Sequence, residues 1–213
     1  MSDLTNVNVI DHPFVKDSLA HLRNKKTDIR RFRFHSDQIC TFLFAEAIKG
    51  LKFRQEEIET PVGTTVVEKL ADEVIVVPVL RSGLAMLFGA IHLLPKSKVG
   101  FVGYARDEKT AIASEYYWKL PPITQHSVLI VTDPMLATGG TILHMLERLS
   151  QQGPQPKEMR VVCVVAAPEG IRKVQEKFPK VKIFTAAVDQ GLNSKAYIVP
   201  GLGDYGDRYF GTD

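Results

Sequence analysis

The spacing of hydrophobic positions changes near residue 73. Before that point, apolar residues recur at helical intervals in Phe14 to Leu22 and in Ile39 to Leu51, so the first third is predicted to be helical. Beyond it, short runs rich in β-branched residues predict strands at Val74 to Leu80, Val99 to Tyr104, Val128 to Thr132, Met159 to Ala166 and Val181 to Ala187. Near-continuous apolar strands of this kind are typical of a parallel sheet covered on both faces.

Segments of helical length separate most of these strands, from Leu84 to Leu93, from Thr141 to Gln151 and from Gly170 to Phe178. Strand, helix and strand in repeated succession predict an α/β fold built on a doubly wound, mostly parallel sheet. The 213 residues are enough for one sizeable domain, and no repeat or long linker divides them. We therefore expect residues 1–213 to form a single domain.

One interval, Arg106 to Gln125, interrupts this alternation. It is polar in Asp107 to Thr110, aromatic in Tyr116 to Trp118, and followed by two prolines. Loops of this length in compact domains are often lids over a site. A β-hairpin at the sheet edge is the structural alternative, and the two are compatible.

Composition narrows the classes of function. Hydrophobic residues make up 45% and charged residues 24%, as in ordinary globular proteins. No run approaches the roughly 18 apolar residues of a membrane helix, and the N-terminus lacks the features of a secretory signal, so we expect a cytoplasmic protein without a membrane partner. Cys40 and Cys163 stand in separate apolar stretches, which favours buried free thiols. The six histidines show no metal-binding spacing.

The formal net charge of +3 suits an anionic small substrate and gives only weak support to nucleic-acid binding. The most basic stretch, Thr27 to Phe34, interleaves arginines with aromatic residues. It can contact phosphate, but a solvated arm or a subunit contact is the favoured interpretation.

Candidate chemistry begins where the strand Val128 to Thr132 ends. Asp133 follows it, at the edge where open α/β sheets bind their ligands, and its two oxygens can accept hydrogen bonds from neighbouring hydroxyls such as those of a ribose. Gly139 and Gly140 let the backbone approach a ligand closely, and the next helix offers N–H groups to a phosphate. A plain strand, turn and helix is the alternative, and the loop alone does not choose between them.

The segment Val128 to Gly140 resembles the phosphoribosyl diphosphate (PRPP) signature of the phosphoribosyltransferases. Most members have two adjacent acids where this chain has Asp133-Pro134, and the proline form is characteristic of the uracil phosphoribosyltransferase family. Three further segments agree with that family in the same order along the chain: Pro78 to Gly83, Ala166 to Gly170, and Asp189 through Thr212. The resemblance extends from about His12 to the C-terminus.

The resemblance implies a phosphoribosyltransferase-type fold with flanking helices, a protruding arm and a small hood made by the N-terminal and C-terminal segments. It gives Arg81, Arg106 and Asp204 catalytic roles, with both arginines on the diphosphate, a task that suits the planar guanidinium fork. Ser82 stands where alanine is usual and adds one hydroxyl. The implied PRPP-binding residues are Arg81, Arg106, Asp133, Pro134, Met135, Leu136, Ala137, Thr138, Gly139, Gly140, Thr141 and Asp204.

The tail implies a uracil pocket formed by Ile198, Gly203, Asp204 and Tyr205, largely through backbone groups. Tyr205 departs from the small residue common in bacterial relatives. The tail also fits the dinucleotide pattern G-x-G-x-x-G, but we expect no such site, because the crossover helix and distant acid that it needs do not follow.

The implied reaction transfers the 5-phosphoribosyl group of PRPP to N1 of uracil, giving UMP and diphosphate. Mg²⁺ is the implied cofactor, carried by PRPP without direct protein ligation. We expect a homo-oligomer, a dimer or tetramer, and GTP as an effector to be tested. Two alternatives remain: a phosphoribosyltransferase for another base, or an RNA-binding regulator on the same fold. The regulator would use a basic face of Arg23, Lys25, Lys26, Arg30, Arg31 and Arg33. The uracil-specific tail counts against both.

Overall fold

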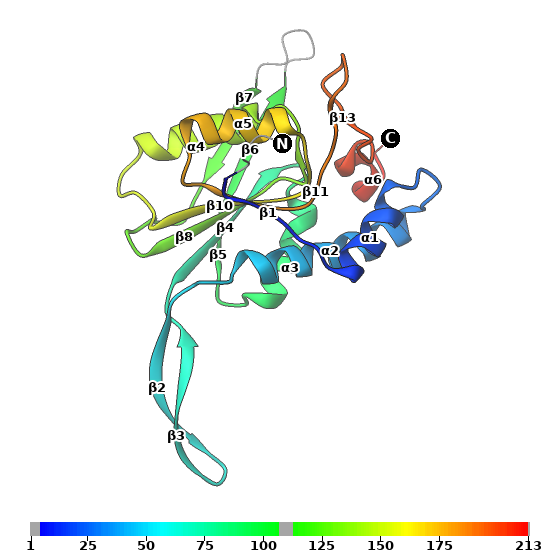
Figure 1. Cartoon of the computed structure of the whole chain (residues 1–213). Helices are drawn as coiled ribbons and strands as arrows, with labels where there is room; N and C mark the ends of the chain where they lie inside the picture. Colours follow the sequence, from blue (N-terminus) through cyan, green and yellow to red (C-terminus); the bar gives the residue numbers. More distant parts are fainter. Residues whose placement is uncertain (1–4, 107–112, 213) are drawn as a thin grey trace.

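The computed structural model describes residues 5–106 and 113–212. A central sheet carries α4 and α5 on one face and α1, α2 and α3 on the other (Figure 1). No helix of this described part is long and apolar enough to cross a membrane.

The strands of the main sheet run in the order β1-β11-β10-β8-β4-β6-β7, with β5 beside β4 and β9 beside β10. Every pairing is parallel except that of β6 with β7, so the predicted doubly wound, mostly parallel sheet is confirmed. The strands are β1 (Val7–Val9), β4 (Glu73–Leu80), β5 (Lys98–Val99), β6 (Phe101–Arg106), β7 (Ala113–Lys119), β8 (Ser127–Thr132), β9 (Met135–Leu136), β10 (Glu158–Ala166) and β11 (Lys182–Val188).

Neighbouring residues of β4 belong to two different cores. Val74 and Val76 pack with α1, α2 and α3, whereas Ile75 and Val77 pack with α4 and α5. All four are buried, and burying an aliphatic side chain of this size contributes roughly 1.5–3 kcal/mol. This double burial explains why the strand sequences are apolar throughout rather than alternating.

Local chemistry fixes several helix starts. Asp28 caps α2 by accepting a hydrogen bond from the Arg31 N–H at 2.9 Å, and Pro13 occupies the first turn of α1, where no donor is needed. Most of the basic stretch Thr27 to Phe34 is therefore the start of a helix. The interpretation as a solvated arm is wrong, and the subunit contact stays a prediction. The helices are α1 (Pro13–Arg23), α2 (Ile29–Ala47), α3 (Leu84–Leu93), α4 (Gly140–Gln151), α5 (Pro168–Lys177) and α6 (Tyr205–Phe210).

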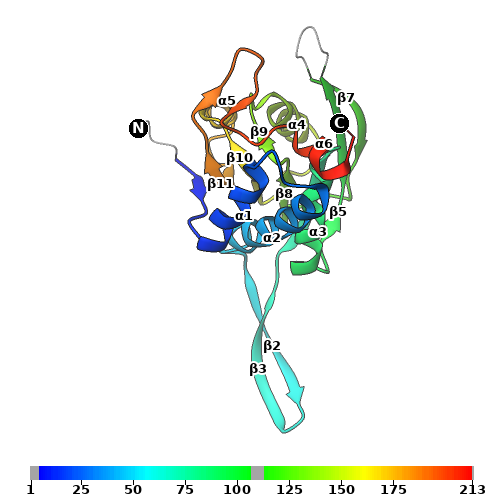
Figure 2. The same ribbon diagram turned by 90° about the vertical axis from the view of Figure 1, so that its right-hand side faces the viewer.

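A two-stranded hairpin of β2 (Phe53–Thr60) and β3 (Gly63–Leu70) projects far from the rest of the chain (Figures 1 and 2). None of its residues is buried. The expectation that the first third is helical is wrong here. The missed signal is the Pro61-Val62 turn between two stretches that contain β-branched residues, Ile58 and Thr60 before it and Thr64 to Val67 after it.

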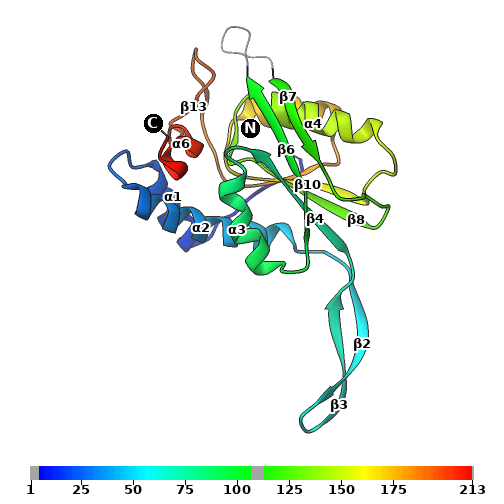
Figure 3. The ribbon, with the colours of Figure 1, turned by 180° about the vertical axis from the view of Figure 1, so that it is seen from behind.

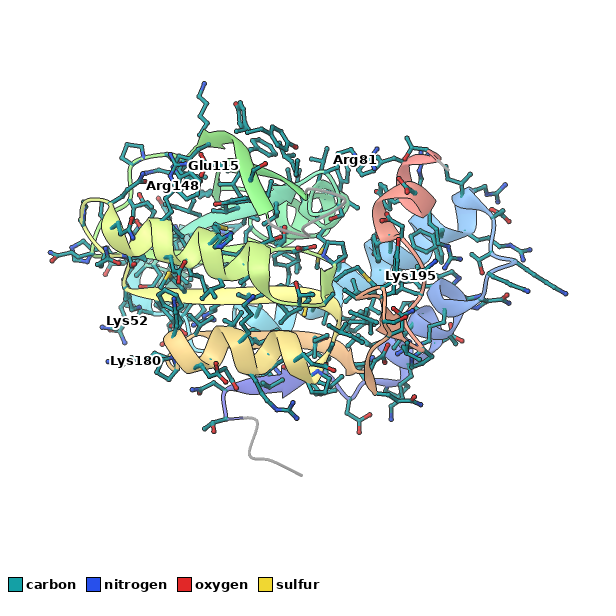
Figure 4. The ribbon with its side chains drawn as sticks, turned by 90° about the horizontal axis from the view of Figure 1, so that it is seen from above. Lys52, Arg81, Glu115, Arg148, Lys180 and Lys195 are labelled. Carbon is teal, nitrogen blue, oxygen red and sulfur yellow. The ribbon has the colours of Figure 1, made fainter. Side chains whose placement is uncertain are left out.

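The hairpin alternative for Arg106 to Gln125 is confirmed, because β7 pairs antiparallel with β6 at the sheet edge. The polar segment Asp107 to Thr110 lies outside the described residues, so its role as a lid stays a prediction. Arg148 of α4 lies 4.1 Å from the centre of the Trp118 ring and forms an ion pair with Glu115, which fastens β7 to α4 (Figure 4).

Candidate active site

The loop from Asp133 to Thr141, called the phosphate loop below, is joined to β10 by backbone hydrogen bonds. The Asp133 N–H donates to the Val162 carbonyl at 3.3 Å. The Pro134 carbonyl accepts from two successive N–H groups of β10, those of Val164 and Val165, at 3.0 and 3.1 Å. The short strand β9 lies inside this loop and also pairs with β10. The loop is thereby held at the carboxyl edge of the sheet.

Two glycines allow the phosphate loop to pack directly on the start of α5. Gly139 has φ +72°, and a Cβ on it would stand 2.6 Å from the Gly170 carbonyl oxygen. A Cβ on Gly170 would in turn stand 2.4 Å from the Ala137 carbonyl oxygen. No heavier residue fits at either position without displacing backbone. This contact explains structurally why the segment Ala166 to Gly170 accompanies the loop.

The phosphate loop ends by opening α4. Gly139 is the N-cap residue, its carbonyl accepts from Leu143 N–H at 2.9 Å, and Thr138 Oγ1 accepts from Gly140 N–H at 3.4 Å. The N–H groups of a first helical turn have no intrahelical acceptors and carry partial positive charge. The start of α4 is therefore suited to an anion such as a phosphate.

The turn between β4 and α3, residues 81–83, is called the Arg81 loop below. It lies next to the phosphate loop because β4 and β8 are neighbours in the sheet. Ser82 Oγ donates to Asp133 Oδ1 at 3.4 Å, and the same oxygen accepts from Met135 N–H at 3.4 Å. The Leu80–Arg81 peptide bond is cis. The Ser82 hydroxyl thus contacts the Asp133 carboxylate, a partner that the sequence did not reveal.

Arg81 links this edge of the sheet to the C-terminal tail. One Nη donates to Asp207 Oδ1 at 2.8 Å and the other to Thr212 Oγ1 at 3.2 Å. The hydrogen bond from Thr212 and then the one from Arg81 hold the pKa of Asp207 below its usual value. The Arg81 side chain remains 59% exposed beside α6 (Figure 4), so its guanidinium is accessible to a ligand.

Arg106 is the last residue of β6, and β6 pairs with β4. Arg81 directly follows β4, so the two arginines stand at the ends of neighbouring strands. The side chain of Arg106 lies outside the described part, and its role stays a prediction.

Asp204 stands at the start of α6, where its Oδ1 accepts from Asp207 N–H at 2.9 Å. A Cβ on Gly206 would stand only 3.5 Å from Ser82 Cβ, so the tail touches the Arg81 loop. Gly203, just before Asp204, has φ +83° and is exposed. The structure therefore brings the tail, the Arg81 loop and the phosphate loop to one edge of the sheet.

Helix α1 and residues 189–212 form a cover beside that edge, and we call these two segments the hood (Figures 1 and 3). Within it, β12 (Gly191–Leu192) pairs with β13 (Ile198–Val199). Glu169 Oε1 of α5 accepts from Leu192 N–H at 3.2 Å, so the start of α5 supports the hood as well as the phosphate loop.

The hood is closed by an ion pair between residues far apart in the chain. Arg23 of α1 donates to both oxygens of Asp189, at 2.9 and 2.5 Å, and to the Gly201 carbonyl at 2.7 Å. Asp189 also accepts from Gly201 N–H at 3.0 Å. The Asp189 side chain is only 4% exposed, and the bidentate geometry compensates its desolvation. Sequence spacing gives no signal for this pair.

The side chain of Tyr205 points away from this edge and into the core. It is 1% exposed, its hydroxyl donates to Ser36 Oγ at 2.6 Å, and its ring meets Phe32 edge to face with centroids 5.1 Å apart. Burial raises the pKa of Tyr205 well above its usual value. Only the backbone of Tyr205 is therefore available to a ligand at this edge.

Among the described residues, one group of three side chains has ligand atoms close enough for a metal ion: Asp17, His21 and His35. It joins α1 to α2 and is not part of the phosphate loop. The two imidazole rings stack with centroids 3.9 Å apart and planes 10° apart. Lone pairs of ring nitrogens lie in the ring planes, so nearly parallel planes do not direct them at one ion.

A family model described as uracil phosphoribosyltransferase matches residues 9–212. A uracil phosphoribosyltransferase of Limosilactobacillus fermentum is 44% identical over 96% of this chain and 97% of its own length. One of Finegoldia magna is 45% identical over 98% of this chain and 100% of its own length.

Solved structures agree with these sequence matches. AQ2163 protein from Aquifex aeolicus superposes with a TM-score of 0.90 at 36% identity, covering 96% of this chain and 97% of that one. A hypoxanthine-guanine phosphoribosyltransferase of Bacillus anthracis gives a TM-score of 0.51 at 11% identity over 82% and 90%. The second likeness concerns the fold alone.

Sheet order, phosphate loop and hood together define the architecture of a phosphoribosyltransferase. The family match over nearly the whole length is more specific. The chain belongs to the uracil phosphoribosyltransferase family.

Proposed function

We propose that this protein transfers the 5-phosphoribosyl group of PRPP to N1 of uracil, giving UMP and diphosphate. The observation that carries the proposal is the meeting of the phosphate loop, the Arg81 loop and the Asp204 tail at one edge of the sheet. Family membership supports the same reaction. Because the sheet and the hood both supply site residues, we also propose that residues 1–213 act as one domain.

In this proposal PRPP lies along the phosphate loop. The 5-phosphate binds at the start of α4, and Asp133 accepts hydrogen bonds from the ribose hydroxyls. The contact from Ser82 supports this role, because it holds the Asp133 carboxylate in place. The loop residues Pro134, Met135, Leu136, Ala137, Thr138, Gly140 and Thr141 bind mainly through backbone groups and short side chains. Gly139 provides the turn.

Arg81 and Arg106 would take the diphosphate. Asp207 and Thr212 each accept one hydrogen bond from Arg81, and the guanidinium has five N–H donors in all. Charge builds up on the diphosphate as its bond to the anomeric carbon breaks, while the ribose gains oxocarbenium character. Donors fixed at that position stabilise the transition state more than the ground state.

The base would bind under the hood. Backbone groups of Ile198, Gly203, Asp204 and Tyr205 present donors and acceptors in fixed directions. Uracil offers a carbonyl where cytosine has an amino group, so an N–H aimed at that carbonyl is left unpaired with cytosine, and buried polar groups left unpaired reject an analogue strongly. The buried Tyr205 ring supports this role indirectly by fixing its own backbone.

The carboxylates of the site fit a magnesium ion that arrives with PRPP. Asp133 and Asp204 are the acids that we place there, and carboxylates, phosphates and waters are the ligands that Mg²⁺ prefers. We propose that these residues bind waters of the ion rather than forming a complete protein cage. The bound ion would supply charge neutralisation on the leaving diphosphate.

We further propose a homo-oligomer assembled through the β2–β3 hairpin. The hairpin projects away from the other described elements (Figures 1 and 2), and its residues Phe53, Val62 and Val66 are 59%, 97% and 58% exposed. Apolar surface on a two-stranded hairpin requires a partner for stability, since an isolated hairpin is marginal in water. GTP activation remains a prediction from the resemblance, tested by titrating GTP into the assay below.

The RNA-binding alternative loses part of its basic face in the structure. Arg23 is committed to Asp189, and Arg33 donates to the Tyr209 carbonyl at 2.8 Å. Arg31 is 73% exposed but lies 3.7 Å from the Asp28 carboxylate. These contacts favour a structural role for the stretch over nucleic-acid binding.

The deciding experiment supplies PRPP and Mg²⁺ with labelled uracil, cytosine, orotate, hypoxanthine or adenine in separate reactions. We expect UMP from uracil, at a rate at least about a hundredfold above that with any other base. A faster reaction with a purine or orotate would assign another base. Absence of any nucleotide product would rule out the transferase reaction.

A further inference from the structure

Lys173 extends from α5 toward the first turn of α4. Its Nζ lies 3.9 Å from the point where a Cβ on Gly140 would stand. Gly140 is the first residue of α4. The amine therefore lies beside the helix N-terminus to which the proposed function assigns the 5-phosphate of PRPP.

The packing of α5 on the phosphate loop determines this position. Gly170 touches the loop so closely that a Cβ would stand 2.4 Å from the Ala137 carbonyl oxygen. Lys173 comes three residues later on the same helix, and residues three apart lie on the same face. The contact that requires glycine at position 170 thus turns the Lys173 side chain toward α4.

Its electrostatic surroundings are unusual for a lysine. A helix N-terminus carries partial positive charge, so a cation there is unfavourable unless an anion is also present. Of two nearby carboxylates, Glu147 bonds to Lys177, which lowers the pKa of Glu147 more than the charge of Lys173 does, and Glu169 accepts from Leu192 N–H. Across residues 5–106 and 113–212, no carboxylate forms an ion pair with Lys173.

We propose that Lys173 binds the 5-phosphate of PRPP, adding an ammonium group to the N–H donors at the start of α4. This inference rests on the proposed function, and it adds a residue that the phosphate-loop pattern does not contain. A lysine is a flexible point charge with three donors, which suits it to close over a phosphate already held by backbone groups.

The test measures binding of ribose 5-phosphate and of diphosphate by calorimetry in the wild type and in Lys173→Gln. We expect ribose 5-phosphate to bind about 10- to 150-fold more weakly to the variant, as for a lost hydrogen bond to a charged group. Diphosphate lacks the 5-phosphate, so its affinity should stay within about twofold. Lys173→Arg should retain most of the wild-type affinity.

Arg172→Gln is the matched control, because Arg172 is the preceding residue of α5, carries the same charge and is also exposed. Its ribose 5-phosphate affinity should equal that of the wild type. In turnover, Lys173→Gln should raise the KM for PRPP by the same factor and leave kcat within about twofold, since it removes binding common to ground and transition states.

Unchanged ribose 5-phosphate binding in Lys173→Gln would overturn the proposal. An equal loss in Arg172→Gln would overturn it too, by showing a general effect of charge. The binding assay contains no base, so its outcome is separate from the proposed function. A protein that makes no UMP but needs Lys173 for ribose 5-phosphate would disprove the function and keep this inference.

Discussion

The phosphate loop and the hood hold their site residues by opposite means. The loop is fixed by backbone hydrogen bonds to β10 and by direct contact between Gly139 and Gly170. The hood is fixed by side chains from distant segments, above all Arg23 with Asp189 and Tyr205 with Ser36. The loop should therefore be sensitive to added atoms, and the hood to removed ones.

Among the variants that test this difference, Gly139→Ala should have the largest effect on stability. The new Cβ meets the Gly170 carbonyl and the left-handed φ of +72° disfavours alanine, so we expect a loss of about 3 kcal/mol in unfolding free energy. Ribose 5-phosphate binding should fall with it, because the loop must move. Chemical denaturation and calorimetry measure the two effects.

Gly153→Ala is the control for that change. Gly153 also has a positive φ, of +44°, but a Cβ there meets nothing within 4 Å. It should cost only about 1 kcal/mol and leave ligand binding intact. Equal losses in both variants would mean that backbone conformation, and not the contact between loop and α5, limits the site.

Arg23→Ala should have the second-largest effect on stability, and it should act on the hood. It leaves the Asp189 carboxylate buried with Gly201 N–H as its remaining partner. Because Arg23 itself is 25% exposed, we expect about 2–3 kcal/mol, below the value for a fully buried pair. Uracil affinity should weaken while ribose 5-phosphate affinity holds, as titrations of each ligand would show.

Arg31→Ala provides the comparison, since its pair with Asp28 is exposed. It should change unfolding free energy by less than about 0.5 kcal/mol. If Arg23→Ala proves equally mild, the hood does not depend on this ion pair.

Tyr205→Phe should have a smaller effect. It removes the hydroxyl that bonds to the buried Ser36 and keeps the ring against Phe32, so we expect about 1–2 kcal/mol of destabilisation. The KM for uracil should stay within about twofold, because the proposed pocket uses only the Tyr205 backbone. A large rise in KM at unchanged stability would place the side chain in the pocket instead.

The smallest effect is expected from the two thiols, one on each side of the sheet. Burial raises the pKa of Cys40 and of Cys163 to about 12. A thiol of that pKa is protonated at pH 8, with about one molecule in ten thousand as thiolate. Neither should react with a thiol reagent in the folded protein, and both should react in denaturant. Rapid labelling of either in the native state would reveal local opening.

Much of the parallel sheet could be read from the sequence because each strand is buried on both faces and so is apolar throughout. The phosphate loop could be read for a similar reason, since its turn and its close contact with Gly170 need glycine at position 139 in a short local pattern. The β2–β3 hairpin could not be read by apolar spacing, because it has no buried face. The place of Tyr205 in the uracil pocket stays a prediction, and the direction of its side chain depends on a space between Phe32 and Ser36 on α2.

The sequence by itself determined the alternation of strands and helices between about residues 73 and 188, the glycine turn of the phosphate loop and the motifs of its family. These depend on neighbours in the chain, whose chemistry is local. Only the tertiary structure decided that Arg23 closes the hood on Asp189, that Arg81 reaches Asp207 and that Lys173 lies beside the start of α4. Such contacts join residues far apart in the chain, and their distances depend on how the layers pack rather than on any local pattern.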